Sequence, residues 1–512
     1  MLKKFAIAIL TMLVTALPLS GIARAADGVN MLANPSMETA AVATTPDGWT
    51  ASTYGDLETA TTETYETTGR TGKSVKTTVG TYTANAANAG DAKWSFTPVA
   101  VTAGTNYEYS HWYKSDVATE VDVQTVYSSA ANLPADCDQA TLTCFDNLLT
   151  LPAAANWTQA KVTFVAPAGA STVTVFQPLN KTGYVQIDDA DLHSYTPVGF
   201  SRAIVTLTFD DGWLDQFTNG RPVLNTAGVP STYYLLTGTV NDPGYMTVAN
   251  MQTLGTDPVG NELASHTIHH CSLSGTADHT DDPTNCAVPL STAQVDNELG
   301  GAQTQLRAWF PGIANVANNF ATPYGEYDTN SLNEIQKYYR SHRSTETGYN
   351  TKDNFNRYNI RVQNILDSTT PAQVQAWVDQ AIKDKSWLVL VYHRVMPTDP
   401  TAGAEDYNVT PANLATEAAY IKSKADAGQV AALTVQKALD ELEPQVGPIT
   451  TPTPPATGKT GDVSGDGVVN DDDAILMFAN WGKTGTNVRG DVNHDNKVDD
   501  TDAVLMFANW SK

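Results

Sequence analysis

The chain has 512 residues and a formal net charge of -25 at pH 7. A single hydrophobic core rarely extends over so many residues, so we expect several domains. The negative charge argues against a nucleic-acid partner, because it would repel phosphate.

Residues 1–25 are typical of a secretory signal peptide. Two lysines precede an apolar run over residues 5–19, and Ala23-Arg24-Ala25 offers the small residues that signal peptidase accepts. The apolar run is short for a membrane span, and no later run is long enough to cross a bilayer. We therefore predict a secreted protein, extracellular or associated with a cell surface, that has no transmembrane span after cleavage.

Four cysteines form two pairs that are close in sequence, Cys137 with Cys144 and Cys271 with Cys286. In an exported chain such pairs are expected to form disulfides. A zinc knuckle is the weaker alternative, because the Cys-x-x-Cys spacing is missing.

Residues 26–196 are expected to form a β-sandwich. Short alternating runs, such as residues 106–113 and 160–165, are separated by turn signals, and no segment with helical periodicity intervenes. This pattern favours two antiparallel sheets. With residues 34–39 near its start and 187–192 at its end, the segment resembles the jelly-roll carbohydrate-binding modules of glycan-active enzymes.

Residues 197–446 change to an α/β pattern. Apolar runs over 203–209 and 387–392 alternate with helix-period stretches such as 292–309 and 371–383. The alternation predicts parallel strands in a wound or barrel fold. A linker rich in Pro and Thr is expected over residues 447–460, where repeated Pro prevents packing.

The strongest chemical signal is Thr208-Phe209-Asp210-Asp211-Gly212, directly after an apolar strand. In barrels this end of a strand lies at the catalytic rim. Two adjacent carboxylates repel each other unless a cation or a proton lies between them, so a metal ion is expected. Taken alone, adjacent aspartates are common in surface turns.

A second motif, residues 265–270, places two imidazoles four residues apart. At this spacing His266 and His270 would share one face of a helix, and His269 could replace His270 because a spacing of three also shares a face. One aspartate and two histidines can hold a divalent ion and leave a position open for water.

Two further motifs end predicted strands. Residues 320–325 turn sharply at Pro323-Tyr324-Gly325, and His393 follows the apolar run over 387–392. Four motifs at successive strand ends predict one shared site.

These motifs resemble those of the polysaccharide deacetylase family, also called carbohydrate esterase family four, over about residues 201–442. The resemblance implies a distorted (β/α) barrel with a catalytic divalent metal, zinc in the first place and cobalt or nickel as alternatives. It implies three metal ligands, namely Asp211, His266 and His270.

The same resemblance implies the catalytic roles. Asp210 would be the general base and His393 the general acid, and the backbone N–H of Tyr324 would face the oxyanion. The family's third motif usually opens with an arginine that orients the base, whereas this chain has Ala321 there. Arg361 resembles an arginine found between the third and last motifs of some extracellular deacetylases, so we hypothesise that it neighbours Asp210. An ordinary surface arginine is the alternative.

An acidic repeat follows the linker, over residues 461–481 and 490–510. Oxygen-bearing side chains occupy the ligand positions of an EF-hand-like calcium loop in each copy. The predicted calcium ligands are Asp462, Ser464, Asp466, Asn470 and Asp473, then Asp491, Asn493, Asp495, Asp499 and Asp502. A single amphipathic run after each loop makes residues 461–512 resemble the small all-α dockerin domains, which bind cohesin modules on scaffolds or cell surfaces. An acidic solvated tail is the alternative.

Together these patterns predict a secreted multidomain polysaccharide deacetylase, a hydrolase acting on carbon–nitrogen bonds other than peptide bonds. Metal-activated water would remove acetyl groups from an N-acetylated glycan such as chitin, peptidoglycan or poly-N-acetylglucosamine. One alternative is an esterase acting on O-acetyl-xylan. The other is a non-catalytic carbohydrate-binding or docked wall protein. Ala321 at the position of the family arginine and the two flanking modules favour this alternative.

Overall fold

The computed structural model of the chain describes residues 28–55, 61–82, 90–135, 137–274, 285–286, 289–398 and 407–446, and then residues 469, 474, 477–478, 480–484, 490, 492 and 497–510. The predicted signal peptide and linker lie outside the described residues. The chain divides into two compact units, Met1–Val446 and Gly447–Lys512. No helix in the described parts of the chain has both the length and the apolar character that a membrane span requires.

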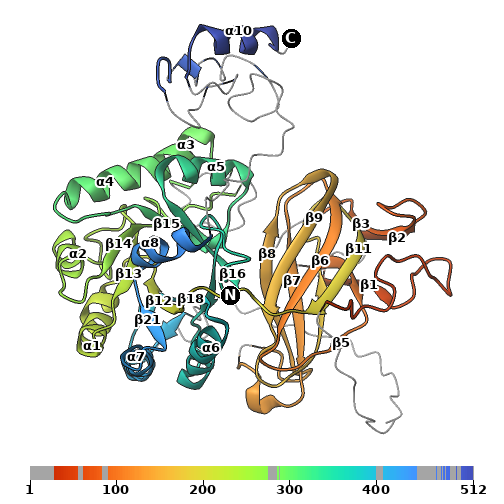
Figure 1. Cartoon of the computed structure of the whole chain (residues 1–512), viewed down its shortest axis with the longest axis horizontal. Helices are drawn as coiled ribbons and strands as arrows, with labels where there is room; N and C mark the ends of the chain where they lie inside the picture. Colours follow the sequence, from red (N-terminus) through yellow and green to blue (C-terminus); the bar gives the residue numbers. More distant parts are fainter. Residues whose placement is uncertain are drawn as a thin grey trace. The chain divides into compact units, whose positions relative to one another are not determined.

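Two antiparallel sheets form the first half of the larger unit (Figure 1). One sheet runs in the order β1-β4-β10-β7-β8, with β5 paired to β10, and the other in the order β2-β3-β11-β6-β9. Their strands are β1 Trp49–Tyr54, β2 Thr61–Glu66, β3 Ser74–Val79, β4 Asp91–Phe96, β5 Val99–Ala100, β6 Asn106–Ser115, β7 Thr119–Tyr127, β8 Thr143–Leu151, β9 Ala154–Val165, β10 Ala170–Phe176 and β11 Gly183–Ser194. The β-rich N-terminal region predicted from the sequence is therefore confirmed.

The two sheets share one core because alternate side chains of each strand point inward. Every second residue of β7, from Thr119 to Tyr127, is buried. Trp94 in the first sheet belongs to the same buried cluster as Tyr109 and Ile187 in the second. Both predicted disulfides, Cys137–Cys144 and Cys271–Cys286, are present.

A closed parallel sheet forms the second half of the unit (Figure 1). Its pairing order is β13-β14-β15-β16-β17-β18-β12, and β12 pairs back to β13, so the ring closes. Its strands are β12 Ala203–Phe209, β13 Ser231–Leu235, β14 Glu262–Ser265, β15 Asn319–Ala321, β16 Ser341–Thr347, β17 Ile360–Asn364 and β18 Trp387–Tyr392, and β21 Val430–Ala432 pairs with the first three residues of β12. Every residue of β12 and β18 is buried, as expected for strands covered on both faces.

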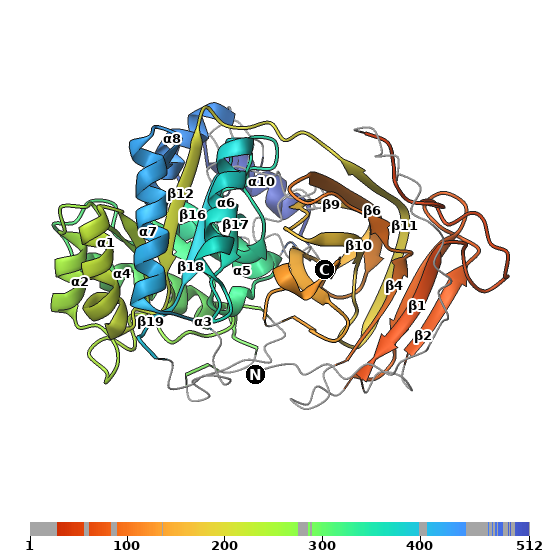
Figure 2. The same cartoon turned by 90° about the horizontal axis from the view of Figure 1, so that it is seen from below.

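Helices surround this barrel (Figure 2). They are α1 Arg221–Ala227, α2 Val248–Gly255, α3 Thr292–Asp296, α4 Ala302–Trp309, α5 Thr329–Tyr338, α6 Pro371–Asp384, α7 Pro411–Asp426 and α8 Val435–Val446. Short helical turns are η2 Ala130–Asn132, η3 Gln216–Gly220, η4 Asn297–Gly301 and η5 Pro323–Gly325, and β19 Arg394–Val395 pairs with β20 Asn408–Val409. The π-helical turn η4 separates α3 from α4.

Helix α8 covers the end of the barrel where the strands begin. Its buried residues Ala438 and Leu439 pack in one cluster with Ile204, at the start of β12, and with Trp387, at the start of β18. The backbone N–H of Gln436 also donates to Glu262, the first residue of β14. The opposite end, where the strands finish, carries the sequence motifs.

The sandwich contacts the barrel through strand β16. Glu346 of β16 accepts a hydrogen bond from the backbone N–H of Thr150 in β8 at 2.8 Å. The same carboxylate accepts from the hydroxyl of Tyr327 and from the amide of Asn359. A buried carboxylate therefore joins the two halves of the larger unit.

The smaller unit contains α10, Asp500–Ala508. Of the ten predicted calcium ligands only Asp499 and Asp502 are among the described residues. Asp499 caps α10 by accepting the N–H of Thr501, and the buried Asp502 accepts the N–H groups of Val492 and Asp499. The other eight lie outside the described residues.

Candidate active site

Five of the predicted site residues lie just beyond the ends of four barrel strands. Asp210 and Asp211 follow β12, His266 follows β14, Tyr324 follows β15 and His393 follows β18. Because the strands are parallel, these ends meet at one rim of the barrel, the end opposite α8.

Asp211, His266 and His270 come together as a possible ligand set for a cation. Oδ1 of Asp211 lies 3.4 Å from Nε2 of His266 and 3.5 Å from Nε2 of His270. Burial alone would raise the pKa of the Asp211 carboxyl, but the imidazole of His266 and the charges of His270 and His393 outweigh it and hold this pKa well below its usual range. The aspartate is therefore ionised, as a metal ligand must be.

A loop, and not a helix, presents the two histidines. Thr267 and His270 have positive φ angles of 77° and 59°, which a right-handed helix excludes. The expectation of one helical face is therefore wrong, although the loop does bring the ring centroids of His266 and His270 within 5.2 Å of each other. Nδ1 of His266 lies 2.8 Å from the backbone carbonyl of Ala321, so its Nε2 faces the site.

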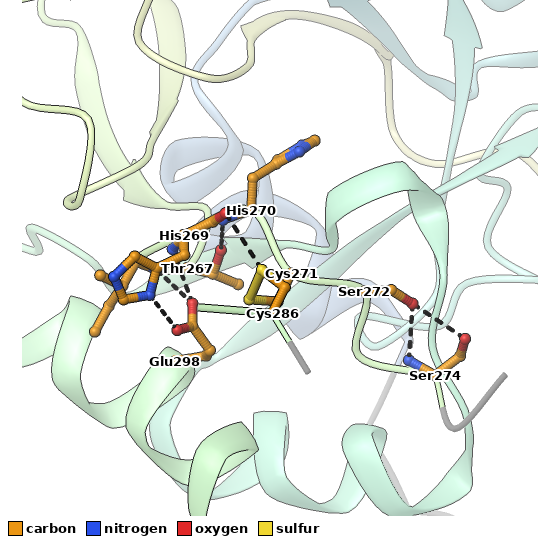
Figure 3. Close-up of a disulfide and its surroundings, with 9 residues drawn as sticks. Thr267, His269, His270, Cys271, Ser272, Ser274, Cys286 and Glu298 are labelled. Carbon is orange, nitrogen blue, oxygen red and sulfur yellow. Dashed lines mark hydrogen bonds and ion pairs between the residues drawn. A yellow bond between two sulfur atoms is a disulfide. The ribbon is translucent and has the colours of Figure 1, made fainter. Parts of the chain in front are cut away.

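His269, the alternative ligand, points elsewhere. Figure 3 shows its ring beside Glu298, while the His270 side chain is directed away from that carboxylate. Glu298, in η4, lies 2.7 Å from Nδ1 of His269 and accepts the backbone N–H groups of Ile268 and His269 at 2.9 Å each. Cys271 lies close to this pair, but its sulfur is bonded to Cys286 and is no thiolate ligand.

The donor set suits a divalent metal. Within the described part of the chain, the buried Oδ1 of Asp211 has no hydrogen-bond donor, although it is the oxygen that faces both imidazoles. Such an atom is costly to bury unless another partner binds it. One carboxylate and two imidazoles match catalytic zinc sites and also suit cobalt and nickel.

Asp210 is paired with an arginine that the sequence analysis missed. Nη2 of Arg343, on β16, donates to Oδ2 of Asp210, and both side chains are buried. The guanidinium also lies over the ring of Tyr234, 5.1 Å from its centroid.

The hypothesis that Arg361 neighbours Asp210 is corrected by this geometry. Arg361 is buried, but its guanidinium donates to the carbonyls of Thr163 and Leu148 in the sandwich, at 2.8 and 2.6 Å. Its strand, β17, directs it outward from the barrel to the neighbouring sheets. Burial lowers the pKa of Arg361.

His393 lies on the other side of the base. Its Nε2 is 3.8 Å from Oδ2 of Asp210. Burial lowers the pKa of His393, although Asp211 and Asp210 act in the opposite direction. The amide of Gln216 donates to the backbone carbonyls of both Asp210 and His393, which ties the ends of β12 and β18 together.

Tyr324 occupies a strained turn next to the metal ligands. Its φ of 57° is left-handed, and its ring lies 4.4 Å from that of His270 between centroids. The following Gly325 has φ 72°, and a Cβ there would meet Thr345 Oγ1 at 1.9 Å, so only glycine fits this turn.

Residues 198–340 match the family model described as polysaccharide deacetylase. The match supports a polysaccharide deacetylase domain in this part of the chain, which includes Asp210, Asp211, His266, His270 and Tyr324. His393 lies beyond it.

Among curated proteins, one from Bacillus subtilis (strain 168) named "Putative polysaccharide deacetylase YxkH" is 24% identical over 154 residues, which are 30% of this chain and 48% of that protein. This chain therefore spans about half the length of that relative.

Solved structures similar to this chain include a family 4 acetyl xylan esterase from Clostridium thermocellum in complex with a cobalt ion, with 19% identity, 46% of this chain and 90% of that chain covered, and a TM-score of 0.31. They also include a family 4 carbohydrate esterase from Streptomyces lividans in complex with acetate, with 17% identity, 45% of this chain and 91% of that chain covered, and a TM-score of 0.28. A third is a pseudoenzyme of the same family from Bacillus anthracis, with 14% identity, 48% of this chain and 70% of that chain covered, and a TM-score of 0.30.

Proposed function

We propose that the polysaccharide deacetylase domain of this chain is an active, metal-dependent hydrolase that removes acetyl groups from an N-acetylated polysaccharide outside the cell. The proposal rests on one observation: a possible set of metal ligands and a possible acid–base pair lie together at one rim of the barrel. Asp211, His266 and His270 are grouped closely enough to hold a cation, and Arg343 and His393 both face Oδ2 of the neighbouring Asp210.

The cation site would supply the electrophile. Asp211, His266 and His270 would hold a divalent metal, which lowers the pKa of a bound water and polarises the acetyl carbonyl. The backbone N–H of Tyr324 would donate to the oxygen of that carbonyl as negative charge develops.

Asp210 would take the proton of the attacking water. Arg343 occupies its Oδ2, and its Oδ1 has no donor among the described residues, so one oxygen remains available as a base. His393, whose Nε2 lies 3.8 Å from Oδ2 of Asp210, would then give a proton to the departing amine. The products are acetate and a free amino sugar.

The test is acetate release from a panel of chitin oligomers, peptidoglycan, poly-N-acetylglucosamine and acetyl-xylan. The metal-free full chain would be reconstituted with zinc, cobalt or nickel and compared with Asp210→Asn. We expect release from an N-acetylated glycan to fall by about 10²-fold or more in Asp210→Asn. Faster release from acetyl-xylan would favour the esterase instead. Glycan binding without acetate release in the metal-loaded protein would contradict catalysis.

Arg343 weakens the case for a non-catalytic protein. That alternative drew on Ala321, which leaves the base without its expected arginine. A guanidinium from the neighbouring strand fills that role in the geometry.

For the other parts of the chain we propose a secreted protein with a carbohydrate-binding-like sandwich and a calcium-binding, dockerin-like tail. The oxygen ligands of the repeat support calcium, and a cohesin-type or cell-surface partner would follow from the resemblance. A calcium titration of the full chain, followed by circular dichroism and reversed with a chelator, tests the calcium. Titration of the same protein without any spectral change or heat of binding would contradict it.

A further inference from the structure

Trp213 follows the two aspartates at the barrel rim and touches one of them. Its indole Nε1 donates to Oδ2 of Asp211 at 3.0 Å. The other oxygen of the same carboxylate, Oδ1, is the one that faces Nε2 of His266 and Nε2 of His270. The indole therefore engages the oxygen that does not face the imidazoles.

The indole ring is held on both faces. Tyr245 stacks on one face with 4.3 Å between ring centroids and 22° between planes, and the guanidinium of Arg394 lies 4.1 Å from the indole centroid. Asp215 fixes Arg394, because its Oδ2 lies 2.7 Å from Nε of the guanidinium. Rotation of the indole away from Asp211 would break these contacts.

The backbone around Trp213 is fixed as well. Residues 212–214 pair with residues 244–246, since the N–H of Met246 donates to Gly212 and the N–H of Leu214 donates to Gly244. Asp211 itself has a left-handed φ of 74°, so its turn needs support from its surroundings.

We propose that Trp213 is a positioning residue that fixes the orientation of the Asp211 carboxylate, so that Oδ1 alone faces the metal. This inference rests on the proposed metal site. Groups that hydrogen-bond to a metal ligand typically change metal affinity about 10- to 100-fold when removed. The stack of Tyr245, Trp213 and Arg394 also joins the Asp211 turn to β19, which begins directly after His393.

The experiment is a titration of the metal-free full chain with cobalt(II), with calcium in excess to occupy the C-terminal repeat. Trp213→Phe removes the N–H donor but keeps an aromatic ring in the stack. We expect its dissociation constant for cobalt to rise about 10- to 100-fold. The visible spectrum of bound cobalt should also change, because the freed Oδ2 can join the coordination shell.

Two variants serve as controls. Trp309→Phe makes the same chemical change in α4, where the tryptophan only packs against the core, and should bind cobalt as the wild type does. Tyr245→Leu removes the stacking partner but keeps the indole N–H, and should lose less affinity than Trp213→Phe. Thermal unfolding of the metal-free proteins separates loss of the site from loss of the fold.

A Trp213→Phe protein with wild-type cobalt affinity and spectrum would overturn the inference. A weaker affinity that appears only with a matching drop in metal-free stability would overturn it too, because the role would then be structural. Failure of the wild type to bind cobalt, with His266→Ala as the blank, would instead overturn the proposed metal site and this inference with it.

Discussion

Arg343 and Arg361 are both buried, and each binds groups that lie far away in the sequence. Arg343 pairs with a carboxylate, and Arg361 donates to backbone carbonyls. Arg343 meets Asp210 across 133 residues, inside the barrel. Arg361 meets the carbonyls of Leu148 and Thr163 in the sandwich. The two side chains therefore predict different consequences when they are changed.

Arg343→Gln should lower acetate release by roughly tenfold to a hundredfold, because Asp210 loses the guanidinium that pairs with its Oδ2 and orients the carboxylate. Its cobalt affinity should stay at the wild-type value, since Arg343 touches no proposed ligand in the described structure. Steady-state kinetics and a cobalt titration on one protein sample measure both. Arg361→Gln is the matched control, and equal losses of turnover in the two variants would contradict the assignment.

The two neighbouring histidines give a second prediction at this scale. His270→Ala should abolish cobalt binding, whereas His269→Ala should retain it, because the His269 ring is turned toward Glu298. Isothermal titration of each metal-free variant distinguishes them. Binding retained in His270→Ala and lost in His269→Ala would reverse the assignment.

The sequence predicted those site residues that belong to a recognisable motif at the end of a strand. It brought Asp210, Asp211, His266 and His393 to one site, which the structure does as well. It missed Arg343, Gln216 and Glu298, because each acts through one hydrogen-bonded contact with a distant segment and no local pattern marks such a partner.

At the scale of elements, the sequence predicted the apolar strands β12 and β18 but did not predict β16. The sequence of β16 is Ser-His-Arg-Ser-Thr-Glu-Thr, yet most of these residues are buried. Its polar side chains find partners inside the protein, as Arg343 does with Asp210 and Glu346 with Thr150. A hydrophobicity pattern cannot detect a strand whose burial depends on paired polar groups.

The same limit applies to the metal-binding loop. A spacing of four residues suggested a helix, but Glu298 binds two backbone N–H groups of the loop and stabilises its irregular path. Glu298 lies in the π-helical turn between α3 and α4. The periodicity over residues 292–309 predicted one continuous helix and gave no sign of this turn.

Helix α7 and strand β18 are joined by a pH-sensitive contact. The hydroxyl of Tyr392 donates to Glu417 at 2.9 Å, and burial raises the pKa of Glu417 to about 7. Between the unfolded pKa of about 4.3 and this value, the folded protein holds a proton that the unfolded chain releases. The contribution of Glu417 to stability is therefore present below pH 4 and lost as the pH rises to 7.

Glu417→Gln cannot ionise and should escape this loss. We expect the variant to gain stability relative to the wild type between pH 5 and pH 8, by up to about 3 kcal/mol. Urea unfolding of both proteins at the two pH values, followed by tryptophan fluorescence, measures the difference. Parallel changes in the two proteins would show that another group controls the pH dependence.

At the scale of the whole molecule, the sandwich and the barrel are joined by buried polar contacts. Arg361→Leu would leave the carbonyls of Thr163 and Leu148 without their donor, at a cost of about 2 kcal/mol or more. We expect the sandwich and the barrel of this variant to unfold in separate steps in calorimetry.

Lys383→Ala is the control for this effect. It removes an exposed contact between the same two parts, from Lys383 to the carbonyl of Gly104, and should change little. A similar splitting of the transition in both variants, or in neither, would contradict a special role for Arg361.

The closed ring of strands has a consequence for the order in which the site is assembled. Asp210 opens the ring and His393 ends it, and Gln216 joins them only when β18 lies against β12. Asp211, His266 and His270 all precede residue 393 in the chain, so the three proposed metal ligands are synthesised before His393. The residues of the proposed metal site are therefore complete in the growing chain before its proposed proton donor is added.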